Sequence, residues 1–256
     1  MAVAEQVDYY DNGQVRQRYA LEDGQPHGEV VSYDEAGRVV QTAYYRHGQL
    51  DGDLFSYGSE GQVTQKLSFK AGRLHGDMLT YNEHGELVQK VAYRDGDLDG
   101  EMLVYHEGEI QAKLFHRSGT QEGDFLTYDQ KGQIRSRLHY ANGKLNGPAC
   151  LYDEDGNLLK QSHYRDHQLD GEACEYYQNG AVREIAYYRR DVLHGEVLKY
   201  DEYGELTARL FYRDGQLANP PTPDDTPSHD LLSAAPEPVL SPLSLWQKWL
   251  KMLTRG

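Results

Sequence analysis

The sequence predicts an all-β protein: an elongated, twisted antiparallel β-meander of 24-residue hairpin repeats, followed by one short C-terminal helix. Three observations lead to this fold class. Two glycine series recur every 24 residues, apolar and polar residues alternate between the glycines, and the composition changes after residue 217. Repeats are considered first because a fixed period of this length decides the whole architecture.

The two glycine series define the repeat. The first series, usually followed by an acidic residue, comprises Gly28, Gly52, Gly76, Gly100, Gly123, Gly147, Gly171 and Gly195. The second comprises Gly13, Gly37, Gly61, Gly85, Gly108, Gly132, Gly156, Gly180 and Gly204. Both advance by 24 residues except for one step of 23, where a turn residue is missing before Gly108. A period kept over residues 9–217 indicates stacked, equivalent structural units.

Each repeat is expected to contain two strands. Residues 76–81 and 86–93 alternate at period two and are rich in β-branched and aromatic side chains. Between such runs lie segments such as 82–85 and 94–99, which hold the Asn, Asp and Gly typical of tight turns. Two strands per repeat give about 17 antiparallel strands, each paired with its neighbour in the chain.

Alternation predicts that the sheet has one apolar and one polar face. The apolar face is expected to combine first-strand residues such as Leu79 and Tyr81 with second-strand residues such as Leu87 and Tyr93. The polar face is expected to carry the intervening Ser and Thr together with Lys66, Lys90, Lys113, Arg135 and Arg137. The regular Tyr rows either stack along the sheet or contact a partner.

Side chains that depart from the repeat pattern are the candidates for partner binding. Aromatic residues and Arg dominate interface energetics, and scaffold stability demands neither on a solvated face. The candidates within the repeats are Tyr44, Phe115, Arg135, Arg137, His139, Tyr187 and Phe211. We expect a partner to contact residues from about 110 to 212.

The composition divides the chain into a repeat domain at 1–217, a Pro-rich linker at 218–242 and an amphipathic helix at 243–256. Ser241-Pro242 has the form of an N-cap followed by a first-turn proline. Trp246 and Trp249 lie on one apolar stripe of the helix and are further partner-binding candidates. The helix could cap the sheet, dock on its apolar face, enter a partner's groove or lie on an anionic membrane.

Charge and composition exclude several classes of protein. The formal net charge of −15 argues against nucleic-acid binding and favours a basic partner. A run of about 18 apolar residues, which a membrane-spanning helix requires, is absent from the sequence. The first residues lack the basic and apolar regions of a secretory signal, so we expect a cytoplasmic protein.

The residues predict no catalytic site, metal or cofactor. A repeat protein carries similar residues at equivalent positions of every repeat, whereas the catalytic site of an enzyme combines different residues at one place. His27, His75 and His194 alternate with Asp at the position before the repeat glycine. Equivalent positions lie about 9.5 Å apart, too far to share a metal, so solvated turn residues are expected. Cys150 and Cys174 are equivalent positions as well, and free thiols are therefore expected.

The repeat, written G-[ED]-x-x-x-Y-x-x-x-G-x-[LVI]-x-x-x-x-x-Y-x-x-G-x-L-x, resembles the MORN-repeat family. It looks closest to the variant repeats of bacterial YwqK-type antitoxin and immunity proteins. This resemblance implies a β-meander that binds and neutralises a cognate toxin by occlusion. The alternative is a MORN-type scaffold that gathers proteins or tethers them at a membrane surface.

Overall fold

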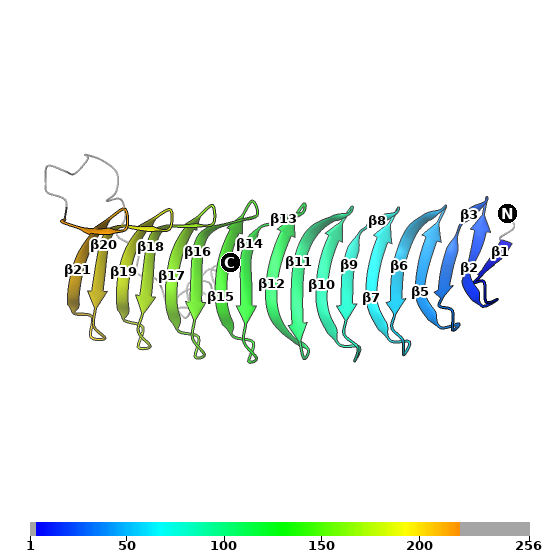
Figure 1. Ribbon diagram of the computed structural model, residues 1–256, viewed down its shortest axis with the longest axis horizontal. Coiled ribbons are helices and arrows are strands. Elements are labelled where there is room, and N and C mark those ends of the chain that lie inside the picture. The colour runs from blue at the N-terminus through cyan, green and yellow to red at the C-terminus, as the bar shows by residue number, and fades with distance from the viewer. Residues whose placement is uncertain (1–3, 221–256) are drawn as a thin grey trace, which may run out of the picture. The chain divides into compact units, whose positions relative to one another are not determined.

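The computed structural model describes residues 4–220, and every strand in that range belongs to one antiparallel sheet of 22 strands. Each strand pairs with its neighbours in the chain, so the sheet is a meander (Figure 1). The chain separates into two units, Met1–Ala218 and Asn219–Gly256. The predicted helix, with Trp246 and Trp249, and the linker beyond residue 220 lie outside the described residues.

The strands follow one another along the chain, and all but the short β3, β8, β13 and β22 have six to ten residues. The first eleven are β1 (Ala4–Tyr9), β2 (Val15–Glu22), β3 (Gln25–Pro26), β4 (Gly28–Tyr33), β5 (Val39–Arg46), β6 (Gln49–Tyr57), β7 (Val63–Lys70), β8 (Arg73–Leu74), β9 (Gly76–Tyr81), β10 (Leu87–Arg94) and β11 (Asp97–His106). The others are β12 (Glu109–Arg117), β13 (Thr120–Gln121), β14 (Gly123–Tyr128), β15 (Ile134–Ala141), β16 (Lys144–Tyr152), β17 (Leu158–Arg165), β18 (Gln168–Tyr176), β19 (Val182–Arg189), β20 (Val192–Tyr200), β21 (Leu206–Arg213) and β22 (Gln216–Ala218). The all-β meander predicted from the repeat is confirmed.

The strand count exceeds the expected 17 for a local reason. Three strands are each divided in two by one irregular residue, at His27, His75 and Glu122. The sheet also gains β1 and β22 at its two ends. Among the described residues, no helix has the length and apolarity needed to cross a membrane.

A β-bulge recurs in nearly every repeat, at the residue before the conserved Tyr. Ser32 pairs with Gln41 and Tyr33 pairs with Val39, which leaves Val40 without a partner. The same shift in register occurs at Ser56/Tyr57, Val104/Tyr105, Thr127/Tyr128, Leu151/Tyr152, Glu175/Tyr176 and Lys199/Tyr200. Because side chains alternate between faces, one extra residue moves the rest of the second strand to the opposite face.

Because of this bulge, the residues that share a face differ from those predicted. Phe55 pairs directly with Lys66, and Leu79 with Lys90, so leucines and lysines share one face. Tyr45, in contrast, lies on the other face. It shares this face with Ala43, two residues earlier, which pairs with Val30 on one side and Leu54 on the other. We call the side with Phe55 and Lys66 the ladder face and the side with Val30 and Ala43 the small-residue face. The predicted division into an apolar and a polar face is wrong because alternation was continued through the bulge.

The buried core is a line of small and medium side chains along the centre of the small-residue face. Its members are Val30, Ala43, Leu54, Val91, Ala149, Ser162, Ala173, Ala186 and Val197, and Cys174 is buried on the ladder face. All described strands belong to a single sheet, so no second layer of strands covers this line. An Ala side chain is buried there because the strands curve (Figure 1) and the longer residues of adjacent rows close over it.

Five glycines of the first series lie inside longer strands, whereas Gly28, Gly76 and Gly123 begin β4, β9 and β14 as the sequence predicts for this position. Gly52 lies in the middle of β6, and Gly100 in the middle of β11. A Cβ atom on Gly52 would come within 3.0 Å of the Tyr44 Cβ, and one on Gly100 within 2.7 Å of the Ala92 Cβ. Their φ angles of +140° and +129° also disfavour any other residue. These glycines therefore let consecutive repeats approach closely.

Candidate protein-interaction surface

Ion pairs cross the ladder face from repeat to repeat. A carboxylate that follows the repeat glycine meets a base on the next strand, two residues from the position directly opposite it and therefore on the same face. The pairs are Asp53–Lys66 at 2.7 Å, Asp77–Lys90 at 2.8 Å, Glu101–Lys113 at 2.5 Å, Asp124–Arg137 at 2.7 Å and Glu196–Arg209 at 3.9 Å. The hydrogen bonds that Lys90 and Lys113 donate to Asp77 and Glu101 raise the pKa of the two lysines, because these bonds stabilise the charged amines. These pairs neutralise one another and leave little free charge on this face.

The ladder is interrupted between Arg137 and Glu196. Pro148 occupies a carboxylate position, and Gln161 and Ile185 occupy two of the basic positions. Glu172 consequently has no base at the ladder position beside it. Its carboxylate instead accepts hydrogen bonds from the Tyr187 hydroxyl at 2.8 Å and the Cys174 thiol at 3.2 Å.

The electrostatics of this interruption keep both donors protonated. Burial, reinforced by the bond to Glu172, raises the pKa of the Tyr187 hydroxyl to about 12. Burial and the same carboxylate raise the pKa of the Cys174 thiol to about 12. Cys174 is therefore a hydrogen-bond donor and not a reactive thiolate. Tyr187 remains 38% exposed, so its ring and the Glu172 carboxylate are presented together to solvent.

Five of the predicted contact residues share one row of the ladder face. Each lies directly opposite a residue that follows a repeat glycine. The pairs are Tyr44 with Glu29, Phe115 with Glu101, His139 with Asp124, Tyr187 with Glu172 and Phe211 with Glu196. The structure therefore brings the scattered aromatic candidates into alignment, spaced by whole repeats.

Two of the predicted contacts are already engaged within the ladder. Arg137 Nη2 lies 2.7 Å from Asp124 Oδ2, and His139 Nδ1 lies 2.8 Å from Asp124 Oδ1. Burial alone would raise the pKa of Asp124, but these two donors outweigh it and hold that pKa below its usual value. Asp124, Arg137 and His139 thus form a satisfied cluster next to the interruption.

Arg135 is separated from the other candidates. It holds the bulge position, and Arg183, the equivalent residue two repeats further along, contacts Glu175 on the small-residue face. The Nη1 atom of Arg135 is buried without a hydrogen-bond partner. Alternation predicts one face for Arg135 and Arg137, because the bulge at Arg135 cannot be recognised from the residue types.

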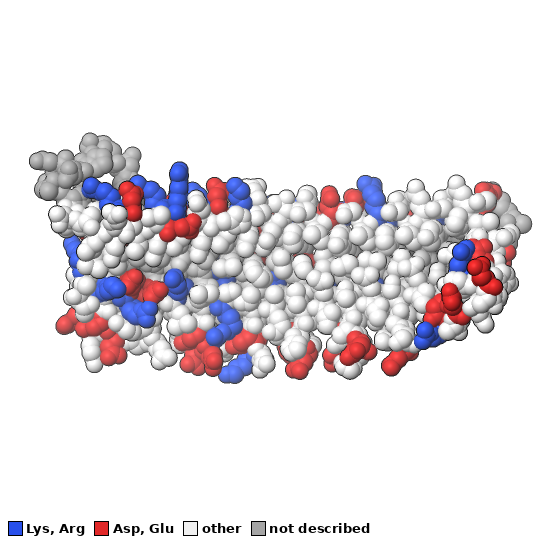
Figure 2. All heavy atoms as spheres, viewed as in Figure 1, with Lys and Arg blue, Asp and Glu red and all other residues white. Residues whose placement is uncertain are grey.

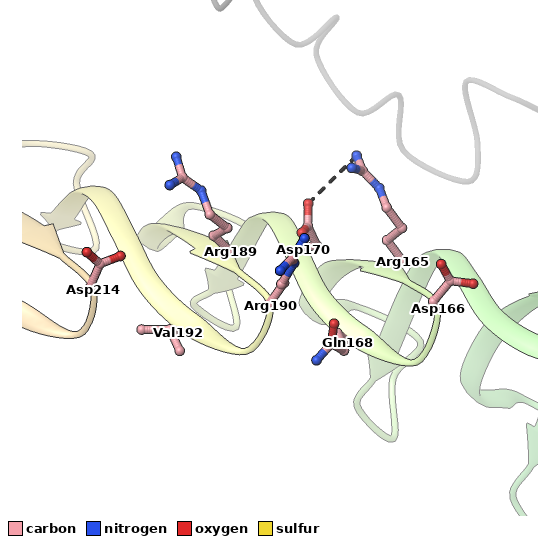
Figure 3. A pocket seen from close by; sticks show the side chains of 8 residues that line it. All are labelled: Arg165, Asp166, Gln168, Asp170, Arg189, Arg190, Val192 and Asp214. Carbon is pink, nitrogen blue, oxygen red and sulfur yellow. Dashed lines mark ion pairs between the residues drawn. The ribbon is translucent and has the colours of Figure 1, made fainter.

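A second feature lies on the turn edge between β17 and β22. The repeat pattern of the sequence does not reveal it. An open depression of about 900 Å³ is lined by Arg165, Asp166, Gln168, Asp170, Arg189, Arg190, Val192 and Asp214 (Figure 3). Arg165 pairs with Asp170 at 3.7 Å. Figure 2 shows charged residues concentrated along the edges of the face in view, with bases most frequent toward this end of the sheet.

The turns beside this depression are strained. In the other turns of this edge Gly holds the second central position, whereas Asp166-His167 and Arg190-Asp191 have positive φ at two non-glycine residues. Each second residue accepts a backbone hydrogen bond from the preceding repeat. Leu145 N–H donates to His167 Nδ1 at 3.3 Å, and Leu169 N–H donates to Asp191 Oδ1 at 2.7 Å.

Part of the repeat region matches a known family model. A family model described as MORN repeat variant matches residues 121–142, 145–166 and 169–190. No curated protein sequence matches the chain.

Two solved structures cover most of the described repeats. One is titled as a Photorhabdus luminescens Tc holotoxin pore with the mutation TccC3-D651A, at 14% identity and a TM-score of 0.21, covering 82% of this chain. The other is a TcdB2-TccC3-Cdc42 crystal structure, at 12% identity and a TM-score of 0.17, covering 84%. This chain spans 13% of the length of each. The family match, within a sheet that keeps one period and one register, supports a MORN-repeat protein.

Proposed function

We propose that this protein is a MORN-type repeat scaffold that works by binding another protein. We further propose that the partner is a cognate bacterial toxin, neutralised by occlusion in the cytoplasm. The observation that supports binding most directly is the interruption of the charge ladder at Glu172 and Tyr187. Like Glu29, which has Thr42 at the base position, Glu172 offers a carboxylate without a paired base, and it does so in the middle of the predicted contact region.

The paired and unpaired parts of the ladder differ in what they offer a partner. A partner that covers a pair such as Asp77–Lys90 must desolvate two charges that already satisfy each other, which gains little. At Glu172, a base from the partner would instead gain a new ion pair beside an exposed Tyr ring. The net charge of −15 would steer a basic partner toward this chain.

Occlusion is supported by the extent of the ladder face. Phe115, Tyr187 and Phe211 lie in one row that spans five repeats, so a bound protein would be covered over a broad strip. The antitoxin role itself follows from the resemblance of the repeat to YwqK-type proteins. Membrane tethering would depend on residues 243–256, outside the described part of the chain.

The test is rescue of growth. The full chain is co-expressed with toxin candidates encoded beside its gene, as wild type and as the double variant Glu172→Gln/Tyr187→Ala. We expect the wild type to restore growth and the double variant to restore it poorly. Glu101→Gln is the matched control, because Glu101 occupies the same repeat position but is paired with Lys113. Binding of a purified partner without any inhibition would favour the general scaffold over the antitoxin.

A further inference from the structure

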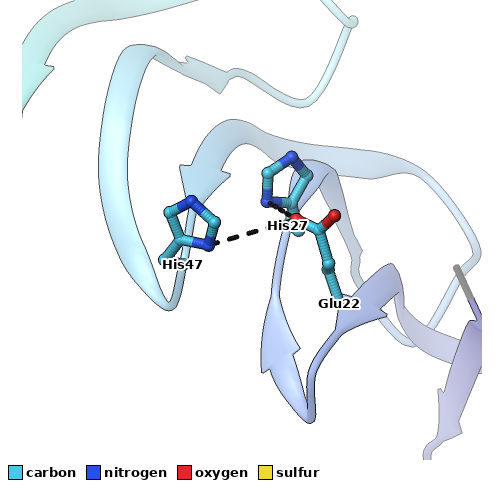
Figure 4. A group of neighbouring side chains, drawn as sticks. All are labelled: Glu22, His27 and His47. Atoms are coloured by element: carbon cyan, nitrogen blue, oxygen red, sulfur yellow. Dashed lines mark ion pairs between the residues drawn. The ribbon is translucent and has the colours of Figure 1, made fainter. Parts of the chain in front are cut away.

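Three potential metal ligands converge where the first two repeats meet. Glu22 ends β2, His27 lies between β3 and β4, and His47 is in the turn between β5 and β6 (Figure 4). One donor atom from each lies within 4.8 Å of the others. His27 Nδ1 is 2.9 Å and His47 Nδ1 is 4.0 Å from Glu22 Oε2.

The backbone holds these residues in place. The His27 amide donates to the Ala20 carbonyl at 2.9 Å, and the Gly48 amide donates to the Pro26 carbonyl at 2.9 Å. The two imidazole rings meet edge to face, with centroids 5.3 Å apart. The convergence is therefore fixed by the sheet register and the turn, and only the side-chain torsions remain adjustable.

His27 supplies a second, independent observation. Its Nδ1 atom is buried and has no hydrogen-bond partner, although Glu22 Oε2 lies only 2.9 Å away. In the tautomer that carries its proton on Nε2, the Nδ1 lone pair and the Glu22 carboxylate face each other as two ligand atoms for one metal ion. A buried imidazole nitrogen facing a carboxylate is a donor arrangement that Zn²⁺ accepts.

The composition of this junction is peculiar to the first repeat. The position of Glu22 holds a base in most other repeats, and there it contacts Asp: Arg46–Asp51 and Arg94–Asp99 at 3.8 Å, and Arg165–Asp170 at 3.7 Å. In the first repeat, Glu22 occupies the position of the base, and His27 occupies the position of the Asp. The cluster joins three non-equivalent positions, so the repeat spacing of about 9.5 Å that argues against a histidine ladder does not apply to it.

We propose that Glu22, His27 and His47 form a Zn²⁺ site. Two imidazoles and one carboxylate are a donor set that Zn²⁺ uses with one coordination position left open. Tetrahedral ligands at about 2.0–2.2 Å from the metal lie about 3.4 Å from one another. The side chain of His47 is 69% exposed, so a change of rotamer brings its nitrogen into range without disturbing the sheet.

The test is calorimetric titration of the metal-free full chain with zinc chloride in a non-chelating buffer. We expect one equivalent to bind to the wild type and to raise the melting temperature. Glu22→Gln and His27→Gln should each weaken binding at least tenfold. His75→Gln is the control, because Lys70 and Asp95 hold the other two positions beside His75. A wild type that binds no zinc, or a His27→Gln variant that binds as well as the wild type, would overturn the proposal.

A gain-of-site variant tests the geometry in the opposite direction. Lys70→Glu combined with Asp95→His reproduces the cluster around His75, two repeats along the sheet. Asp95 has a φ of +53° and His47 a φ of +48°, so the turn accepts the same residue. We expect this variant to bind a second equivalent of Zn²⁺. Binding of only one equivalent, with the circular dichroism unchanged, would show that the three positions do not suffice.

Discussion

At the scale of single residues, each carboxylate on the ladder face is defined by the donors it meets. Asp124 is held by Arg137 and His139, whereas Glu172 accepts from a hydroxyl and a thiol. Both occupy the same position after a repeat glycine, and the identity of one or two neighbours separates them. One carboxylate is structurally satisfied, and the other remains able to pair with a base from outside.

Asp124 gives a pH-dependent prediction. Its pKa is depressed in the folded chain, so its contribution to stability is complete above the unfolded value of about 3.9 and is lost as the pH falls through the folded value. Asp124→Asn should therefore make the fall in melting temperature between about pH 5 and pH 2 shallower than in the wild type. Melting curves across this range test it. Parallel curves for the two proteins would show that Asp124 contributes no such linkage.

At the scale of the element, two turns balance strain against a hydrogen bond. A non-glycine residue at positive φ costs about 1–2 kcal/mol, somewhat less for Asp. His167 offsets this cost only with a long neutral bond of 3.3 Å, worth about 0.5 kcal/mol. Asp191 offsets it with a charged bond of 2.7 Å, worth about 1.5–3 kcal/mol.

These magnitudes predict opposite effects for the same kind of substitution. His167→Gly should stabilise the protein by about 1 kcal/mol, and Asp191→Gly should destabilise it by about 1 kcal/mol. Urea denaturation of both variants beside the wild type measures the difference. If both substitutions shift stability in the same direction, the hydrogen bonds do not decide the energetics of these turns.

The hairpin also shows what the sequence could predict. The period, the strand pairing and the turns can be predicted from the glycines. A position with positive φ or a close backbone contact favours Gly, and Gly can be recognised in the sequence. The faces could not be assigned, because the bulge residues Val40, Thr64 and Arg135 resemble ordinary strand residues. The ion pairs of the ladder depend on the register that the bulge sets, so they could not be predicted from the sequence either. Gln161 and Ile185, which stand where most other repeats have Lys or Arg, were the available signs of the interruption.

At the scale of the whole repeat unit, contacts run between neighbouring strands and between the turns and strands of adjacent repeats, so one period can be removed. Deleting residues 77–100 joins Gly76 to Glu101 and keeps the flanking pairs Asp53–Lys66 and Glu101–Lys113. The shortened protein should remain β-rich and melt cooperatively. Deleting residues 77–88 instead removes one strand and reverses the direction of all that follow. Circular dichroism and thermal melting compare the two, and equal behaviour would refute the assigned repeat.

The final prediction rests on the alignment of three aromatic candidates on the ladder face. Phe115, Tyr187 and Phe211 share a row on the ladder face, and Arg135 lies at a bulge on the other side. If a partner covers the ladder face, replacing each aromatic residue with Ala should lower its affinity about tenfold, or about 1.4 kcal/mol, with little change in melting temperature.

Two further variants decide which face binds. Arg137→Ala should weaken binding and also lower the melting temperature, because it releases Asp124 from its pair. Arg135→Ala should leave the affinity unchanged. Titration of the purified toxin against each variant, with melting curves as the folding control, gives both quantities. Loss of affinity in Arg135→Ala alone would place the partner on the small-residue face, because the single-layered sheet exposes the two rows to opposite sides.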